Sequence, residues 1–207
     1  MTLSITPFQE EHEALRDAAA RWAASAADDD GGAAELGLGG DDPWANVVVL
    51  QEAFRASRPL GRSVAADSSL PTSLAEAVGV CEAARVEVGR AIAYARQREA
   101  FGRPIAGFQV IKHMLVEMAT AVEACAHLVL RTVDRWQAGL ATDAEVAAAA
   151  RAAATMDLEV TDRAMQVHGG AGYSEEFPVG DAWLDARTFA SEHVDAEDIL
   201  SDLEVSR

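Results

Sequence analysis

Apolar residues recur at helical spacing along most of the chain, most clearly in a stretch that begins at Thr72 and reaches about Glu99. Its stripe consists of Leu74, Val78, Cys81, Arg85, Val88, Ile92 and Ala95, with Arg85 the only polar member. Recurrence every three or four residues is typical of an amphipathic helix. The pattern therefore predicts a long helix over residues 72–99.

Two further long helices follow a break at Phe101-Gly102-Arg103-Pro104. The first ends at Gly139 and carries Phe108, Ile111, Leu115, Met118, Val122, Cys125, Val129, Val133 and Trp136. Thr142-Asp-Ala-Glu145 is a capping-box sequence that begins the second, which ends at the glycines from Gly169 onward. Its inward stripe is Val146, Ala150, Ala153, Met156, Val160, Ala164 and Val167.

Shorter helices are expected before and after these three. Thr6-Pro7-Phe8-Gln9 resembles a helix start, with Phe8, Leu15, Ala19 and Trp22 on one face up to the break at residues 28–32. A second helix spans about residues 43–56, with Val47, Leu50 and Phe54 on one face. Residues 57–71 contain Pro, Gly and Ser and are predicted to form a connection. Short helices are plausible at residues 181–190 and 195–205.

The fold class predicted by these patterns is all-α. Only Val47-Val48-Val49-Leu50 has a strand-like composition, and it lies within a helical period. Three long helices joined by short loops predict an antiparallel bundle with the N-terminal helices packed on it. We divide the chain into a helical region at 1–56, a connection at 57–71 and a four-helix-type bundle at 72–207.

Charge excludes some classes of partner. The 34 acidic and 17 basic residues leave a net charge of −17, which repels nucleic acid and anionic lipid surfaces. No window approaches about 20 uninterrupted apolar residues, and the first residues do not resemble a signal peptide, so we expect a cytoplasmic protein. Cys81 and Cys125 lie in helical patterns without metal-ligand spacing, which favours buried thiols over a disulfide or a metal site.

Two motifs depart from what a plain bundle requires. The first, residues 94–109, places the guanidinium of Arg98 beside the ring of Phe101 at a helix end, with Gln109 one turn into the next helix. Such a guanidinium can bind phosphate oxygens in a bidentate way. The alternative interpretation is that Arg98 is a solvated arginine and Phe101 a core residue.

The second motif is Gln166-Val-His-Gly169-Gly170-Ala-Gly172-Tyr173. Backbone without side chains can approach a ligand closely, so this glycine turn is a candidate for ligand contact. The alternative is that the glycines simply end a helix. Either motif alone is weak evidence for a binding site.

Together and in this order, from about Leu70 to Ala190, the two motifs resemble the C-terminal helical domain of the acyl-CoA dehydrogenase family. Residues 8–17 resemble the family's opening helix, and Glu35-Leu-Gly-Leu38 its short turn. The resemblance implies an oligomeric, FAD-dependent flavoprotein that acts on acyl-CoA thioesters. It implies further that Arg98, Phe101 and Gln109 contact the pyrophosphate and adenine of FAD across a dimer interface, while Gln166, Gly169 and Gly170 surround the same end of the cofactor.

The chain also departs from the family. A full member inserts a β-sandwich between its helical domains, and residues 57–71 are too few for several strands of about five residues each. By its resemblance, the family's catalytic base is expected after the Asp185-Ala186-Arg187 helix, at His193 with Glu192 beside it. No Gly-Thr follows there, and the alternative for Glu192 is a solvated carboxylate. We therefore assign no catalytic residue.

Three functions remain open. The favoured one is a subunit of a heteromeric acyl-CoA dehydrogenase that desaturates an acyl-CoA, in which a full-length partner supplies the base and pocket. This chain would then supply part of the FAD site across the interface and bind little or no FAD alone. The alternatives are a non-catalytic helical scaffold or homodimer that has lost FAD binding, and a non-redox enzyme on thioester substrates that uses Glu192 or His193.

Overall fold

A computed structural model describes residues 10–25, 36, 40 and 43–193 of the chain, and this part is helical except for one short hairpin. The elements are α1 (Glu10–Ser25), α2 (Pro43–Ala56), α3 (Arg58–Ala66), α4 (Thr72–Gln97), β1 (Glu99–Ala100), β2 (Arg103–Pro104), η2 (Ile105–Gly107), α5 (Gln109–Gln137), α6 (Asp143–His168), η3 (Gly169–Tyr173) and α7 (Val179–His193). The prediction of an all-α fold is confirmed.

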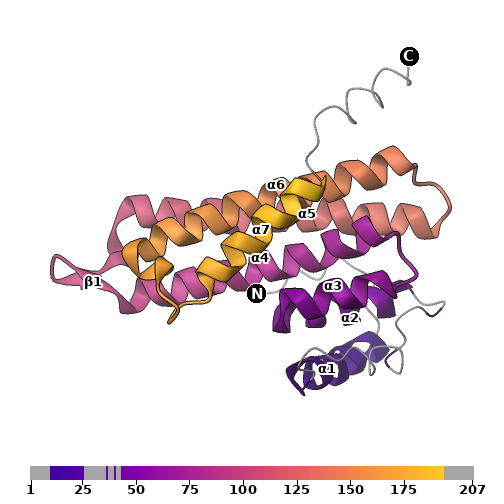
Figure 1. The fold of residues 1–207 in the computed structure, drawn as a ribbon, viewed down its shortest axis with the longest axis horizontal. Helices are drawn as coiled ribbons and strands as arrows, with labels where there is room; N and C mark the ends of the chain where they lie inside the picture. Colours follow the sequence, from indigo (N-terminus) through magenta and orange to yellow (C-terminus); the bar gives the residue numbers. More distant parts are fainter. Residues whose placement is uncertain (1–9, 26–35, 37–39, 41–42, 194–207) are drawn as a thin grey trace, which may run out of the picture.

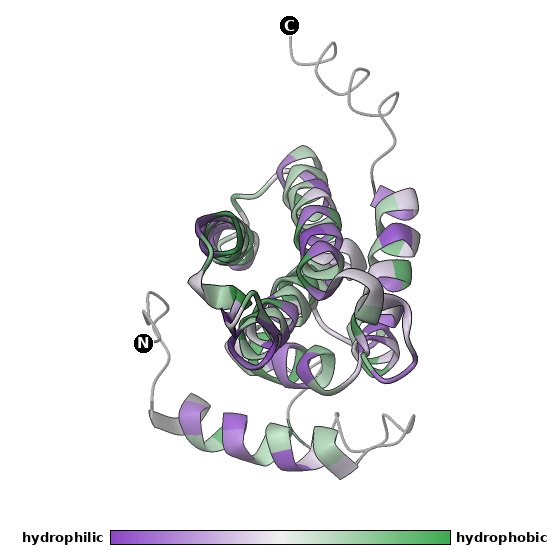
Figure 2. Cartoon of the chain, turned by 90° about the vertical axis from the view of Figure 1, so that its left-hand side faces the viewer, coloured by the Kyte–Doolittle hydropathy of each residue, from purple (hydrophilic) through white to green (hydrophobic). Residues whose placement is uncertain are grey.

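The three longest helices form the predicted antiparallel bundle. Helices α4, α5 and α6 pack against one another along the long axis of the molecule (Figure 1). Helix α7 packs on α6, α2 and α3 pack on α4, and α1 packs on α2. In the end-on view of Figure 2, α1 lies across the base of the bundle, and the helices carry both hydrophobic and hydrophilic residues.

The predicted apolar stripes form the core. All seven stripe residues of α6 are buried, and so are Met118, Val122, Cys125, Val129 and Val133 of α5. In α2, residues 47–50 are completely buried, because α1 covers one side of this helix and α4 the other. The strand-like composition of residues 47–50 therefore reflects a helix buried on all sides.

Several predicted helix ends agree with the structure. Helix α2 spans the expected 43–56, and α4 ends at Gln97, two residues before the expected end. The capping box is formed, with Glu145 N donating to Thr142 Oγ1 at 3.2 Å and Thr142 N donating to Glu145 Oε2 at 2.9 Å. The predicted helix start at residues 6–9, the break at 28–32, most of the turn at 35–38 and the helix at 195–205 lie outside the described residues.

Much of residues 57–71, which the sequence predicts to be a connection without naming a helix, is occupied by α3. Ser57 is its N-cap and accepts a hydrogen bond from Leu60 N at 3.5 Å, and Pro59 lies in its first turn, where a missing N–H has no cost. Leu60 and Val64 turn to the core one helical turn apart. Ser and Pro therefore start a helix here, whereas the composition indicated a loop.

Helix α5 buries only a narrow stripe. By length and composition it could cross a membrane, but its stripe packs against α4 and α6, as expected of a helix in a packed bundle. Large apolar side chains on its other faces are exposed, among them Val110, Val116 and Leu128. Trp136, predicted to lie inward, is also exposed, because it lies near the free end of the helix.

Cys81 and Cys125 are buried and free, as predicted. The Cys81 thiol donates to Cys125 Sγ at 3.9 Å, which joins α4 to α5. This hydrogen bond and complete burial raise the pKa of the Cys81 thiol well above its ordinary value. The described residues contain no group of His, Cys, Asp and Glu side chains that could hold a metal ion.

Candidate functional site

The first motif forms a tight hairpin that projects from the end of the bundle. Strand β1 pairs with β2 in antiparallel register, Ala100 opposite Arg103, so Phe101 and Gly102 make the turn. Their φ angles are 52° and 75°, and type I′ turns require positive values at both positions. A non-glycine residue in this region costs about 1–2 kcal/mol, yet the turn holds a phenylalanine that is 96% exposed. The alternative of Phe101 as a core residue is therefore wrong.

Arg98 and Gln109 lie at the base of this hairpin with free polar groups. Arg98 caps the end of α4 with its backbone N–H, which donates to Tyr94 O at 2.8 Å. Both side chains are exposed and form no hydrogen bond or ion pair with another described residue. Arg103, in contrast, lies over the ring of Phe108 at 4.1 Å.

The charge of this region opposes that of the whole chain. Residues 96–113 contain four basic side chains (Arg96, Arg98, Arg103 and Lys112) and a single acidic one, Glu99, whereas the chain carries a net charge of −17. Helix α5 also begins here, and the free N–H groups of a first helical turn carry a partial positive charge. The hairpin is therefore a locally basic region that can attract an anion.

The second motif ends α6 with backbone that only glycine adopts easily. Gly169 has φ 58° and ψ −136°, and a Cβ built on Gly169 or Gly170 would meet no atom within 4 Å. Both glycines and Gln166 are exposed. The Gly169–Gly170 backbone is thus open to a ligand, and the constraint at Gly169 is conformational.

An aromatic cluster joins the two motifs. The rings of Tyr94 and His168 stack with centroids 4.3 Å apart, and Tyr94 Oη donates to His168 O at 3.3 Å. Phe177 packs edge-on against both rings. His168 Nδ1 donates to Ala164 O at 2.8 Å, which fixes the orientation of the imidazole. The ends of α4 and α6 are therefore held side by side (Figure 1).

All six candidate residues consequently lie at one end of the bundle, at the α4–β1 junction, in the β1–β2 turn, on the first turn of α5 and around the α6–η3 junction. We call this region the hairpin end. Sequence reasoning did not assign Tyr94 or His168 a role in joining the motifs. The signal was present, because each aromatic ring lies within a few residues of a candidate and at the end of a helix.

The position expected for a catalytic base lies at the other end of α4. His193 Nε2 is 3.5 Å from Glu76 Oε2, and both side chains are 14% exposed. The His193 ring packs on Phe189, and its Nδ1 donates to Phe189 O at 3.0 Å. Burial raises the pKa of Glu76, and the nearby His193 and Arg62 partly offset this rise. Glu192 is exposed, so only His193 joins a partly buried pair.

The two candidate regions are far apart. Glu76 and Arg98 are separated by 22 positions of one helix and its cap, about 33 Å at 1.5 Å per residue. A group bound at the hairpin end of one chain therefore does not meet the His193–Glu76 pair of the same chain.

Buried charges are the feature that sequence reasoning missed most. Arg58 binds Asp157 with two hydrogen bonds of 2.6 and 2.8 Å, and both side chains are buried. Glu52, Glu82 and Glu87 are also buried, each beside an arginine. Asp157 lies on the buried side of α6, four residues after Ala153 and three before Val160, which was the available signal.

Fold and site together define a helical bundle with a basic, glycine-containing region exposed at one end. A model of the family described as "Acyl-CoA dehydrogenase, C-terminal domain" matches residues 64–191. The match covers more than half of the chain, so this chain belongs to that family. It begins within α3, ahead of the boundary at residue 72 that the sequence suggested, and the division into three regions stays a prediction.

Individual relatives agree. The short-chain-specific acyl-CoA dehydrogenase of Megasphaera elsdenii is 38% identical over 113 residues, and an acyl-CoA dehydrogenase of Bacillus subtilis is 39% identical over the same length. Both alignments cover 55% of this chain and 29% of the relative. The solved butyryl-CoA dehydrogenase from Megasphaera elsdenii superposes with a TM-score of 0.58 at 28% identity, over 79% of this chain and 38% of that structure.

The chain thus spans less than a third of the length of these curated relatives in the alignments. The family and the fold are established for this chain by the comparisons. The activity, substrates and partners of the whole relatives belong to those proteins. For this chain, the geometry of the hairpin end is the observation that bears on function.

Proposed function

We propose that this chain is a subunit of an FAD-dependent acyl-CoA dehydrogenase and contributes its hairpin end to a flavin site shared with a full-length partner subunit. The reaction of the complex is α,β-desaturation of an acyl-CoA. FAD, when bound, supplies the flavin ring that accepts the hydride. Arg98, Phe101, Gln109, Gln166, Gly169 and Gly170 are the residues that would contact it, at its pyrophosphate and adenine end.

The observation that carries the proposal is the exposed and strained Phe101. A phenylalanine in left-handed backbone with a ring that is 96% exposed gains little within its own chain, where the ring meets Phe108 edge-on with centroids 6.2 Å apart. It has a purpose if the ring packs on a flat group held by another subunit. The free guanidinium of Arg98 at the base of the same hairpin supplies the N–H donors that a pyrophosphate needs.

The fit of the glycine turn supports the same assignment. The basic hairpin attracts the phosphates, while the open Gly169–Gly170 backbone allows a nucleotide to approach without side-chain obstruction. Tyr94 and His168 do not touch the cofactor in this arrangement. They position the two motifs by stacking on each other, and thereby reduce the ordering cost of binding.

Separation of the hairpin end from the His193–Glu76 pair supports a shared site. Because about 33 Å of α4 lies between them, a flavin bound at the hairpin end draws its base from another subunit. The exposed apolar face of α5, which includes Val110 and Val116, begins at the hairpin end and offers a surface for that subunit. The isolated chain is therefore expected to bind little FAD and to be oligomeric in light scattering.

The proposal is tested by co-expression with a full-length acyl-CoA dehydrogenase-like protein of the same organism. We expect a yellow complex that oxidises an acyl-CoA. Arg98→Ala removes a charge-assisted contact and should lower FAD affinity about tenfold to a hundredfold, with partial recovery in Arg98→Lys, because an ammonium does not reproduce the planar fork. Arg131→Ala is the matched control, since Arg131 is an exposed arginine on α5.

Unchanged FAD content in the Arg98→Ala complex would contradict the flavin contact. Failure to form any complex would contradict the shared site and favour the second candidate, a non-catalytic helical scaffold. The specific observation behind that candidate is the engagement of His193 with Glu76 inside the bundle, since a base occupied by an internal partner is not free for a substrate. A scaffold predicts a colourless protein in which Arg98→Ala has no effect.

A further inference from the structure

The only two cysteines of the chain meet each other between two helices of the bundle. Cys81 on α4 and Cys125 on α5 are 44 positions apart in the sequence, and their Sγ atoms are 3.9 Å apart. A disulfide bond is about 2.05 Å long, so the two sulfur atoms need to approach by only about 2 Å to form one. Two free thiols from different helices are therefore within reach of a covalent bond.

Small side chains surround the thiol pair. Ala77 and Ala84 lie one helical turn before and after Cys81 and are completely buried, and Ala121 lies one turn before Cys125. Because alanine has no atoms beyond Cβ, no long side chain at these positions holds α4 and α5 apart. Since α5 buries only a narrow stripe, a small shift of this helix disturbs few other contacts. The sulfur atoms can therefore close the remaining distance.

The two thiols differ in reactivity. The S–H group of Cys81 donates to Cys125 Sγ, and this hydrogen bond lowers the pKa of the Cys125 thiol, although burial opposes it. The same hydrogen bond and burial raise the pKa of the Cys81 thiol. Cys125 is also the more exposed of the two, at 7% against 3%. Because the thiolate is the nucleophile, Cys125 is the residue that reacts first.

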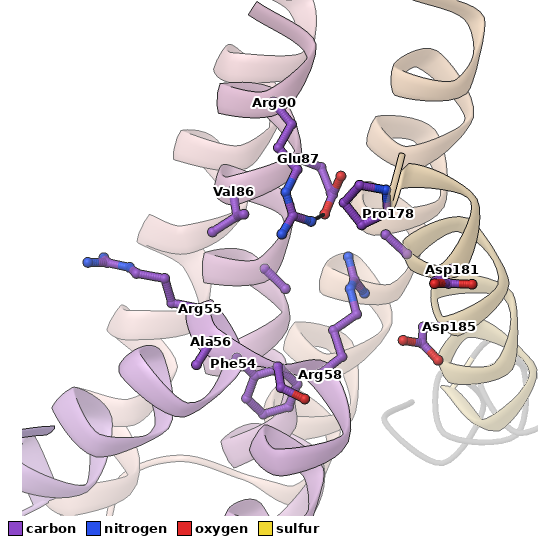
Figure 3. A pocket seen from close by; sticks show the side chains of 13 residues that line it. Phe54, Arg55, Ala56, Arg58, Val86, Glu87, Arg90, Pro178, Asp181 and Asp185 are labelled. Atoms are coloured by element: carbon purple, nitrogen blue, oxygen red, sulfur yellow. Dashed lines mark hydrogen bonds and ion pairs between the residues drawn. The ribbon is translucent and has the colours of Figure 1, made fainter. Parts of the chain in front are cut away.

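The charged residues near the thiols are paired among themselves. Asp157 disfavours negative charge on both sulfur atoms, but it is bound to Arg58, which lines a cavity between α3, α4 and the start of α7 (Figure 3). Arg85, on the same helix as Cys81, binds two glutamates. Within the described residues, no carboxylate forms a hydrogen bond with Cys125. The Cys125 proton is therefore released to solvent.

We propose that Cys125 and Cys81 form a redox site, in which a hydroperoxide converts the two thiols into a disulfide that joins α4 to α5. The Cys125 thiolate attacks one peroxide oxygen, the O–O bond breaks, and hydroxide leaves and takes a proton from solvent, so Cys125 becomes a sulfenic acid. The Cys81 thiol then attacks the Cys125 sulfur. The S–S bond forms, the S–O bond breaks, and the departing hydroxide takes the Cys81 proton and leaves as water. The two thiols together lose two electrons, which reduce hydrogen peroxide to two water molecules.

The disulfide should stabilise the chain without changing the hairpin end. It closes the loop between positions 81 and 125 and so restricts the unfolded state, which should raise the thermal midpoint by about 4–15 °C. Cys81 lies 17 positions before Arg98 along α4 and its cap, about 25 Å at 1.5 Å per residue. The redox site is therefore independent of the flavin contact proposed above.

Treatment of the reduced full chain with hydrogen peroxide, followed by intact-mass measurement and peptide mapping, tests the proposal. We expect the chain to lose the mass of two hydrogen atoms, to yield a peptide pair joined through Cys81 and Cys125, and to recover its mass with dithiothreitol. Two unreacted thiols after treatment would overturn the proposal. Chains linked to one another, or sulfinic acid without an S–S bond, would overturn it as well. This measurement needs no variant, so it does not depend on the folding of one.

Variants test the order of the two steps. In Cys81→Ala the attacking thiol remains and its partner is absent, so dimedone should label a sulfenic acid at Cys125 after peroxide treatment. In Cys125→Ser the remaining Cys81 thiol has the raised pKa and should stay unlabelled. Equal labelling of the two variants, or labelling of Cys81 alone, would overturn the assignment of Cys125 as the attacking thiol.

Thermal unfolding tests the consequence. The peroxide-treated chain should unfold at a higher temperature than the reduced chain, and dithiothreitol should remove the difference. Cys125→Ser receives the same treatment as the matched control, because it reports any effect of methionine oxidation. A disulfide that forms and lowers the midpoint would overturn the proposed fit of the pair to this bond. Arg98→Ala should form the disulfide like the unmodified chain, so failure of the flavin proposal and failure of this one are distinguishable.

Discussion

The hairpin end and the buried charge cluster of Arg58, Asp157 and Glu87 use similar side chains in opposite ways. At the hairpin end, the Arg98 side chain is exposed and has no partner in the described part of the chain, and the Phe101 ring is exposed on strained backbone. In the buried charge cluster, Arg58 is fully committed to Asp157, and Glu87 is held by Arg90. The hairpin end exposes a guanidinium and an aromatic ring to solvent, whereas the buried charge cluster pairs its charged groups mainly within the chain.

The difference shows how to separate binding from structural arginines in a chain with sixteen of them. An arginine that joins α3 to α6 through a buried carboxylate orients helices, and its removal leaves an unpaired buried charge. An arginine at a helix end that touches nothing contributes little to folding. Residue type alone does not distinguish the two, and five perturbations test the contrast.

The largest effect is expected for Asp157→Ala in the buried charge cluster. It leaves the Arg58 guanidinium buried without its partner, which costs about 3–5 kcal/mol. At about 2–4 °C per kcal/mol for a chain of this size, the thermal midpoint should fall by about 10 °C or more. Glu159→Ala, an exposed change on the same helix, should stay within about 0.5 kcal/mol. Equal midpoints for both variants would refute a structural role for the ion pair.

Removing both partners sharpens this result. Arg58→Met combined with Asp157→Leu replaces the pair by apolar side chains and should restore much of the stability that Asp157→Ala loses, because no unpaired charge remains. Denaturant unfolding of the single and double variants measures the difference. A double variant less stable than Asp157→Ala would show that the pair also has an indispensable packing role.

An intermediate effect is expected at the glycines that hold Phe54. A Cβ on Gly79 of α4 would lie 1.9 Å from Phe54 Cδ2, and one on Gly61 of α3 would lie 2.2 Å away. Gly79→Ala should therefore cost about 1–3 kcal/mol through overpacking. Gly89→Ala on the same helix meets nothing within 4 Å and should stabilise α4 by up to about 1 kcal/mol. Relative to the unmodified chain, the free energy of unfolding should fall in Gly79→Ala and rise in Gly89→Ala.

At the hairpin end, stability and function should move in opposite directions. Phe101→Gly removes the strain of a positive φ and should stabilise the isolated chain by about 1 kcal/mol. In the complex, the same change should reduce FAD retention, because the aromatic contact is lost. A variant that loses stability and keeps its flavin would reverse the assignment of Phe101.

The smallest effect concerns pH. Burial raises the pKa of Glu87 above its ordinary value of 4.5, so the folded state binds this proton more tightly than the unfolded state. Its contribution to stability is therefore present below pH 4.5 and is lost as the pH rises through the pKa of the folded state. Glu87→Gln should remove this component of the slope in denaturant unfolding followed against pH. Glu159→Gln should leave the slope as it is, and identical slopes in both variants would contradict the role of burial.

Local signals accounted for most of the helices. The periodic stripes of α4, α5 and α6 and the Thr142 capping box describe interactions within one helix and its immediate contacts, so spacing along the chain was enough. Helix α3 was not predicted, because Ser57 and Pro59 are typical both of helix starts and of loops. Only the burial of Leu60 and Val64 decides between the two.

The six candidate residues of the hairpin end were all identified from the sequence, and their binding role stays a prediction. The sequence could not show that Phe101 is exposed on strained backbone, since a hydrophobic residue next to a helix end fits a core equally well. It also could not show that Tyr94 stacks on His168, because that contact joins positions 74 residues apart.

The sequence by itself determined the helical class, the order and most ends of the helices, and the family, because each depends on residues close together in the chain. Tertiary structure decided which charged residues are buried. Arg58 meets Asp157 across 99 positions, and His193 lies beside Glu76 only because α7 packs back on α6. Burial and pairing are properties of helices in contact, and a pattern along one helix does not contain them.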